Sequence, residues 1–383
     1  MSVKRPLEGM VVLDFSQFLA GPLAGLKLAD LGARVIKIEN PKNGDLCRYL
    51  YLSDTEIGGV NSLFQAINRN KESFCANMKD ANDREKLMKL VSEADIVLQN
   101  FRPGVIERLG FDYESLRKLN PDLVYGSVSG YGNKGPWVSR PGQDLLAQSL
   151  SGLTWLSGND DMPPTPMGLA VADMLAGNSL VQGILAALIK RERGHGGSHV
   201  ETSLLEVLVD FQFEVLTTYL NNGHKKPQRS KINNAHAYLS APYGIYKTAD
   251  SFIAIAMGPV DKLGEMISAP DVAKFTDNKT WFSQRDEIKQ LIQQTLALNT
   301  TAHWMEIFSA NDVWASEVYD WEALLDSDAF HELEMLQKLE HEDIENLMTT
   351  RLPIRLDGEV LKSPKAAPLL GEHTVAISNE FGL

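Results

Sequence analysis

The sequence predicts an α/β fold built on a parallel β-sheet with helices on both faces. Two patterns in the first 130 residues predict it: short apolar segments rich in β-branched residues, and helix-like segments between them. Strands that are apolar on both faces are typical of parallel sheets buried between helices. The chain has 383 residues, which is enough for two or three domains with a sizeable core.

The first three elements are predicted to form a βαβ unit. Met10–Phe15 is an apolar strand, residues 20–32 have a helical period, and Ala33–Glu39 is a second strand. Pro22 lies in the first helical turn, where its missing N–H is tolerated, and Gly32 lies where the helix ends.

The alternation continues to residue 130, after which the pattern changes. We expect a helix at 83–94, a strand at Ala94–Asn100, a helix at 113–120 and a strand at Asp122–Gly130. Further on, the expected elements are a long helix at Leu204–Leu220, a polar connection at 221–234, a strand–turn–strand at 241–257, helices to residue 325, and an acidic, solvated helix face at 320–346.

Charge and cysteine content exclude several classes of protein. Lys and Arg number 37 against 50 Asp and Glu, a net charge of −13, so a broad nucleic-acid surface is not expected. The two cysteines, Cys47 and Cys75, exclude a disulfide framework and a cysteine-based zinc site and fit a reducing cytosol. Any anionic ligand then needs a local basic pocket, and basic residues do gather in the first half of the chain: Lys37, Arg69, Lys71, Lys79, Arg102 and Arg108.

Neither a signal peptide nor a membrane span is predicted, so we expect a cytoplasmic protein. The apolar run near the N-terminus ends at Asp14, too early for a signal peptide. The segment Leu169–Ile189 is apolar, but it contains Asp173, Asn178 and Gln182, which are costly in lipid. A buried core helix is the favoured interpretation.

Familiar motifs for cofactors and nucleophiles are weak or missing. Gly130–Gly135 fits G-x-G-x-x-G after a strand, but Pro136 follows where a dinucleotide site needs a helix, so a glycine-rich turn is favoured. The helix start at Gly21, with Glu39 ending the next strand, could hold an anion but lacks the glycine triplet. The histidines have no familiar metal-ligand spacing, and no G-x-S-x-G elbow is present.

Asp173 allows two interpretations. It lies near the start of a long apolar helix, where an Asp N-cap contributes about 1 kcal/mol. Alternatively, it is a partly desolvated carboxylate at the mouth of a cleft, kept ionised by a helix N-terminus and able to act as a nucleophile. Spacing alone favours the cap.

The order of several segments resembles the family III CoA transferases, the group of formyl-CoA transferase and carnitine CoA-transferase. The resemblance is carried by PLEGMVVLDFSQFLAGPLAGLKLADLGARVIKIENPKNGD, NRNKES, ADIVLQNFRPGVIERLGFDYESLRKLNPDLVYGSVSGYGNKGP, RPGQDLLAQSLSG, GLAVADMLAGNSLVQGILAAL, GSHVETSLLE and PLLGEHT. These segments span nearly the whole chain in the family's order.

The resemblance implies an α/β, Rossmann-like large domain with a parallel sheet, a smaller α+β domain, and an interlocked, ring-like homodimer. It implies residues 1–205 as the N-terminal part of the large domain, 206–234 as a linker helix and crossing, 235–325 as the small domain, and 326–383 as the return into the large domain. Acyl-CoA and a carboxylic acid are the implied substrates. No permanently bound cofactor, metal, nucleic acid or membrane is expected.

The resemblance also implies roles for particular residues. Asp173 matches the family's nucleophilic aspartate, which reverses the preference for a cap and implies aspartyl anhydride and aspartyl-CoA thioester intermediates. Asp144 is similar to an acidic position near the nucleophile. The residues implied to bind CoA are Gln17 and Phe18 after the first strand, Ala76, Asn77, Met78 and Lys79 on the adenine side, and Asn100, Phe101, Arg102 and Arg108 in the segment NFRPG…R.

Two departures and two alternatives accompany the resemblance. The glycine-run lid of formyl-CoA transferase is missing, which argues against formyl and oxalate as the substrate pair, and Asn234-Ala-His236-Ala replaces the usual Asn-x-His-Pro. The related α-methylacyl-CoA racemases place a histidine base where this chain has Gln143, which cannot act as a base. The other alternative is a CoA-binding protein without catalysis, against which Asp173 argues.

Overall fold

The computed structural model describes residues 4–49, 55–57, 60–342 and 344–383. The chain forms two compact units. The first unit consists of Met1–Ala147, Ala170–Leu208 and His331–Leu383, and the second consists of Gln148–Leu169 and Val209–Phe330.

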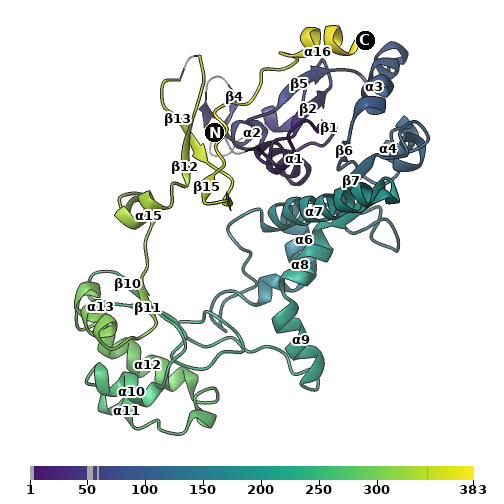
Figure 1. Ribbon diagram of the computed structural model, residues 1–383. Helices are drawn as coiled ribbons and strands as arrows, with labels where there is room; N and C mark the ends of the chain where they lie inside the picture. The colour runs from purple at the N-terminus through teal and green to yellow at the C-terminus, as the bar shows by residue number, and fades with distance from the viewer. Residues whose placement is uncertain (1–3, 50–54, 58–59, 343) are drawn as a thin grey trace. The chain divides into compact units, whose positions relative to one another are not determined.

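The first unit is built on a six-stranded sheet in which every neighbouring pair of strands is parallel. Its order is β5-β2-β1-β6-β7-β8, so the chain adds strands outward from β1 in one direction and then from β6 in the other (Figure 1). This doubly wound arrangement confirms the parallel sheet that the sequence predicts. The strands are β1 (Val11–Asp14), β2 (Arg34–Glu39), β5 (Glu72–Cys75), β6 (Ile96–Gln99), β7 (Val124–Ser129) and β8 (Ser198–Ser203).

One face of this sheet is covered by α1 (Ala20–Asp30) and α7 (Val171–Lys190). A Cβ on Gly126 of β7 would lie 3.0 Å from Ile184 of α7, so only glycine lets this helix lie so close to the sheet. The segment Val171–His195 has the length and composition of a membrane span, but Ile184 is fully buried against the protein. The prediction of a core helix is confirmed.

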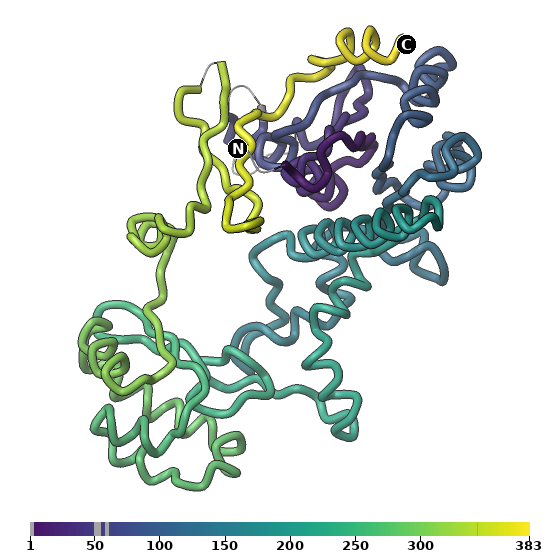
Figure 2. Tube along the Cα trace, in the orientation of Figure 1, coloured from purple at the N-terminus to yellow at the C-terminus, as the bar shows by residue number. Residues whose placement is uncertain are grey.

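The opposite face is covered by α3 (Ala81–Glu93), α4 (Val105–Leu109), α5 (Tyr113–Leu116) and α16 (Thr374–Phe381). The C-terminal helix α16 is anchored by Arg34, whose guanidinium lies 2.6 Å from the Glu380 carboxylate. The end of the chain therefore lies beside strands from its first eighty residues, as the yellow and purple segments of Figure 2 show.

Short elements complete the first unit. They are η1 (Leu46–Arg48), the antiparallel pair β3 (Glu56–Ile57) and β4 (Val60–Asn61), α2 (Ser62–Asn68), η3 (Arg191–His195), and the hairpins of β12 (Leu336–Leu339) with β13 (Leu347–Thr350) and of β14 (Arg355–Leu356) with β15 (Glu359–Val360). The helix α8 (Leu204–Phe211) begins in the first unit and crosses into the second after Leu208. The helix α6 (Asp144–Ser151) spans the boundary between the units.

The second unit packs helices against a small antiparallel sheet. Its strands are β9 (Gly244–Lys247), β10 (Phe252–Ile255) and β11 (Ala315–Glu317), so the expected strand–turn–strand is confirmed. Tyr246, Ile288 and Phe308 are fully buried in its core. Its helices are η2 (Leu153–Trp155), α9 (Phe213–Asn221), α10 (Val260–Met266), α11 (Pro270–Ala273), η4 (Asn278–Thr280), α12 (Arg285–Leu296), α13 (Thr301–Ala310), α14 (Trp321–Leu325) and α15 (Asp328–Glu332), the last of which crosses the boundary.

Three local expectations were wrong. The long helix at Leu204–Leu220 is broken at Gln212, whose backbone leaves the helical region. The helix expected at 113–120 has only one turn. The acidic stretch 320–346 is not one helix, because it contains two short helices and then β12; Glu334 has a positive φ of 50°, which a helix cannot accommodate.

Candidate functional site

The order of the strands in the large sheet reverses between β1 and β6, and this switch point is here called the crevice. Ligands of open α/β sheets bind at such a point, outside the carboxyl ends of the strands. Two loops meet there: the Gln17 N–H donates to Asn100 Oδ1 at 2.8 Å, and Asn100 Nδ2 donates to the Gln17 carbonyl at 2.6 Å. This pair fixes the loop after β1 to the loop after β6.

The loop after β1 is also held by the segment after β2. Asp45 accepts a hydrogen bond from the Phe18 N–H at 3.2 Å, and Cys47 Sγ donates to the Phe18 carbonyl at 3.1 Å. Phe18 has a φ of 64°, a left-handed conformation that costs a bulky residue about 1–3 kcal/mol. Its ring is 44% exposed, so the loop holds an aromatic surface open at the crevice.

Three of the basic residues that the sequence offered as anion ligands are instead buried in ion pairs. Lys37 contacts Asp45 at 2.7 Å, Lys71 contacts Asp14 at 2.9 Å, and Arg69 contacts Asp30 at 2.6 Å. Their side chains are at most 3% exposed, so they cannot reach a ligand. The Lys71–Asp14 pair fixes the end of β1, the Lys37–Asp45 pair fixes the segment after β2, and the Arg69–Asp30 pair joins the ends of α2 and α1. These three residues therefore do not contribute to the basic cluster that was expected to hold an anion.

Asp173 is the third residue of α7 and does not cap it. The capping position is Ala170, and Asp144 supplies the acceptor: its Oδ1 lies 2.7 Å from the Ala172 nitrogen and 3.4 Å from the Asp173 nitrogen. The N-cap interpretation of Asp173 was therefore wrong. Its carboxyl group is left available, while Asp144 satisfies the helix N-terminus.

The carboxyl group of Asp173 is partly buried at the start of α1. It accepts a hydrogen bond from the backbone of Ala20, the first residue of that helix. The helices meet closely, since a Cβ on Gly177 would lie 2.8 Å from the Ala20 carbonyl oxygen. Burial and the neighbouring Asp144 charge raise the pKa of Asp173 to about 7, and the Ala20 hydrogen bond opposes that rise. A large fraction is thus ionised at neutral pH, with little water around it.

The segment implied to contact adenine follows β5 at the same edge of the sheet. Its backbone is fixed by Glu39 and Asp83: the Ala76 N–H donates to the Glu39 carbonyl at 2.9 Å, and the Asn77 N–H donates to Asp83 Oδ2 at 2.9 Å. Met78 packs against the core, and Lys79 is exposed. Because β5, β1 and β6 are parallel, their carboxyl ends lie at one edge of the sheet, and this segment lies at the same edge as the loops after β1 and β6.

The segment after β6 places two exposed arginines near the crevice. Gln99 Oε1 accepts from the Phe101 N–H at 2.8 Å and so orders the start of the loop. Gly104 has a φ of 83°, and a Cβ there would lie 3.2 Å from Nη1 of Arg108. Arg102 and Arg108 are exposed, and neither makes an ion pair with a described carboxylate, so both are available to an anion.

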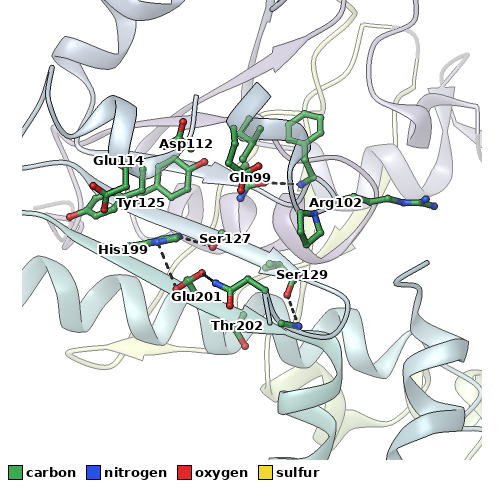
Figure 3. A pocket seen from close by; sticks show the side chains of 18 of the residues that line it. Gln99, Arg102, Asp112, Glu114, Tyr125, Ser127, Ser129, His199, Glu201 and Thr202 are labelled. Atoms are coloured by element: carbon green, nitrogen blue, oxygen red, sulfur yellow. Dashed lines mark hydrogen bonds and ion pairs between the residues drawn. The ribbon is translucent and has the colours of Figure 1, made fainter. Parts of the chain in front are cut away.

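A hollow of about 390 Å³ lies over β7 and β8, and Phe101, Arg102 and Pro103 of this loop also line it. In it, Ser127 Oγ lies 2.9 Å from His199 Nε2, and Glu201 is 3.8 Å from Nδ1, too far for a hydrogen bond. Burial lowers the pKa of His199. The lining is rich in carboxylates, and Arg102 extends away from this cluster (Figure 3). It suits neither phosphate binding nor an oriented serine nucleophile.

The chain is similar to known proteins over nearly its whole length. A model described as CoA-transferase family III matches residues 7–374. The chain belongs to that family. It is 36% identical to acetyl-CoA:oxalate CoA-transferase of Acetobacter aceti over 79% of the chain and 78% of the relative, and 33% identical to succinate–glutarate CoA-transferase of Agrobacterium fabrum over 99% and 96%. The protein is thus a CoA transferase, as the sequence predicts.

Solved structures have the same fold. A CaiB/BaiF family protein from Brucella suis aligns with a TM-score of 0.84 and 29% identity over 98% of this chain and 99% of the other. A protein from Mycobacterium tuberculosis aligns with a TM-score of 0.83 and 30% identity over 97% and 99%.

Sequence reasoning missed the residues that position the site. Asp45 and Cys47 hold Phe18, and Ala20 holds Asp173, through contacts that no local pattern announces. Gly21 was the available signal: a Cβ there would overlap the Ser16 side chain, which marks a close turn.

Proposed function

We propose that this family III CoA transferase moves CoA from an acyl-CoA donor to a carboxylic acid, with Asp173 as the nucleophile. The observation that carries the proposal is the state of the Asp173 carboxyl group, which is partly buried, held by the Ala20 backbone, and raised in pKa to about 7. A poorly hydrated carboxylate beside a ligand crevice can attack a thioester carbonyl.

The reaction balances without ATP. Asp173 Oδ attacks the donor thioester, the C–S bond breaks, and a mixed anhydride and CoA thiolate result. The thiolate attacks the aspartyl carbonyl, which gives an aspartyl-CoA thioester and frees the donor acid. The acceptor carboxylate then displaces the thiolate to form a second anhydride. The thiolate attacks its acceptor carbonyl, which gives the new acyl-CoA and restores the Asp173 carboxylate.

Asp144 is a positioning residue in this proposal. It binds the Ala172 and Asp173 N–H groups, which sets the start of α7 and the direction of the nucleophile. Its charge also raises the pKa of Asp173.

The CoA moiety is proposed to lie along the crevice and the loops beside it. Arg102 and Arg108 supply charge to its phosphates, since they are exposed while Lys37 and Lys71 are not. The remaining contacts are proposed to be Gln17, Phe18, Ala76, Asn77, Met78, Lys79, Asn100 and Phe101.

Dicarboxylic acids are the proposed acceptor class. The relatives named above act on oxalate, succinate and glutarate, and a 33%-identical relative from Haloarcula marismortui is named succinyl-CoA:mesaconate CoA-transferase. The shared chemistry is a second carboxylate on the acid. These names support that class over the formyl and carnitine subtype. We further propose an interlocked homodimer in the cytoplasm, with domains 1–205, 206–234, 235–325 and 326–383.

Trapping the covalent intermediate tests the proposal. The protein is incubated with succinyl-CoA or acetyl-CoA and treated with hydroxylamine, and the mass of the peptide containing Asp173 is measured. The wild type should give a hydroxamate there, Asp173→Asn should give none, and Asp144→Asn should give it more slowly. Equal adduct formation in Asp173→Asn would contradict the assignment.

The same experiment separates the alternatives. A racemase would exchange the α-proton of a 2-methylacyl-CoA with deuterium and form no adduct, whereas a CoA-binding protein would do neither. Gln143 stands where the related racemases have their histidine base, which supports the transferase.

A further inference from the structure

We propose that a hollow in the second unit binds a small, multiply charged anion that carries phosphate or carboxylate groups. This hollow, here called the basic hollow, has a volume of about 860 Å³. Four cations line it, Lys226, Arg229, Lys231 and Arg285, against two carboxylates, Asp160 and Asp286. The whole chain has a net charge of −13, so this excess of positive charge is a local exception.

The two arginines are buried without a carboxylate partner among the described residues. Arg229 is 8% exposed and donates to the carbonyls of Ser157 and Met162. Arg285 is 6% exposed and donates to Ser230 Oγ at 3.2 Å and to the Gln228 carbonyl at 3.0 Å. Carbonyl dipoles orient these guanidinium groups but do not neutralise them, and a buried unpaired charge is costly.

A third cation increases the imbalance. Lys289 lies one helical turn after Arg285, is fully buried, and donates to the same Ser230 Oγ at 3.0 Å. Burial and the Arg285 charge lower the pKa of Lys289 to about 8, while the Asp286 charge opposes that shift. Arg285 and Lys289 thus converge on Ser230, which follows Arg229 in the chain, and an anion in the hollow would meet the positive field of these side chains.

The position of the cations favours a small molecule over a protein surface. The buried guanidinium groups of Arg229 and Arg285 can be reached only by a group that enters the hollow, and the exposed Lys226 and Lys231 can follow it as it enters. Trp155, also in the lining, is 58% exposed and can report occupancy. None of these residues belongs to the crevice between β1 and β6, so the inference does not rest on the proposed function.

Titration of the intact protein tests the inference. Pyrophosphate and citrate are titrated in separate experiments, in buffer free of phosphate and CoA, and the titrations are repeated with the double variant Arg102→Ala and Arg108→Ala, which removes the proposed phosphate contacts at those two residues. Tryptophan fluorescence and calorimetry follow binding. We expect saturable binding of at least one probe, and the comparison between the two assigns the source of the charge as phosphate or carboxylate. The fluorescence change should be lost in Trp155→Phe while the calorimetric signal remains.

Matched charge variants complete the test. The double variant Lys226→Gln and Lys231→Gln removes two exposed charges at the hollow, and Lys247→Gln with Lys279→Gln removes two exposed charges elsewhere in the same unit. The first should weaken binding about tenfold or more, and the second by less than about twofold. Absence of saturable binding of both probes, or equal affinities in the two double variants, would overturn the inference. So would a first double variant that alters only the association of two copies of the chain, which would make the cations part of an interface.

Discussion

Replacing Asp173 with asparagine should stabilise the protein at the pH at which it removes activity. The pKa of this carboxyl group is about 7 in the folded protein, against 3.8 for an ordinary aspartate. A difference of about three pKa units means that the ionised carboxylate lowers the free energy of unfolding by at most about 4 kcal/mol, since one unit is about 1.36 kcal/mol. Because the carboxyl group is partly exposed, and because Asn can still accept the hydrogen bond from Ala20, we expect Asp173→Asn to raise the free energy of unfolding by about 1–3 kcal/mol.

The sign of the effect follows from proton binding. Between about pH 4 and pH 7 the folded protein holds the Asp173 proton more tightly than the unfolded chain does, so wild-type stability falls as the pH rises through this window. Below about pH 4 the carboxyl group is protonated in both states and the penalty disappears. Asp173→Asn lacks this titration, so its advantage should grow from pH 5 to pH 8.

Thermal unfolding of both proteins at pH 5, 6, 7 and 8 measures the advantage. A change of about 1 kcal/mol in the free energy of unfolding shifts Tm by about 2–4 °C in a domain of 150–250 residues. We therefore expect the Tm of Asp173→Asn at pH 8 to be several degrees above that of the wild type. Asp122 is an exposed aspartate in the same unit, and Asp122→Asn is the matched control. The difference in Tm between this variant and the wild type should be the same at all four pH values. An Asp173→Asn advantage that is the same at pH 5 and pH 8, or a loss of stability at pH 8, would refute the reasoning.

Three further predictions test the site. Because the pKa of Asp173 is raised to about 7, kcat should rise about tenfold between pH 6 and pH 8 in a pH–rate profile; a flat profile would exclude this group as the titrating nucleophile. Arg108→Ala should raise KM for acyl-CoA about tenfold or more with kcat little changed, since a charge-assisted phosphate contact is lost; a fall in kcat at constant KM would contradict a binding role. Gly177→Val should lower Tm and activity together, because its Cβ would lie 2.8 Å from the Ala20 carbonyl oxygen; a fully active, equally stable variant would show that α1 and α7 need not be so close.

Much of the first unit was predictable because its signals are local. The strands β1, β2, β6 and β7 lie within the predicted ranges, since each is a short apolar run bounded by turn residues. The break at Gln212 was not predictable in this way, because both Leu204–Phe211 and Phe213–Asn221 keep an apolar helical period and only the tertiary packing separates them.

The site was less predictable because its partners are distant in sequence. Lys71 and Asp14 are 57 residues apart and Asp144 binds the Ala172 N–H 28 residues away, so an isolated lysine looks solvated and an isolated Asp173 looks like a cap. Only the topology brings the carboxyl ends of β1, β5 and β6 to one edge of the sheet, and only the topology decides which charged side chains are buried in ion pairs.

The division of charges supports the anion site that we propose at the sheet edge of this acidic protein. The buried lysines Lys37 and Lys71 neutralise Asp45 and Asp14, and these contacts hold the loop after β1, including Phe18, in its left-handed conformation. The exposed Arg102 and Arg108 are free of described ion pairs and can meet a phosphate. Among the described residues no cation pairs with the Asp173 carboxyl group, and burial together with the Asp144 charge raises its pKa to about 7. In the proposed mechanism, burial therefore separates the two kinds of charge: the arginines proposed to bind CoA are exposed, and the carboxylate proposed to react is partly buried.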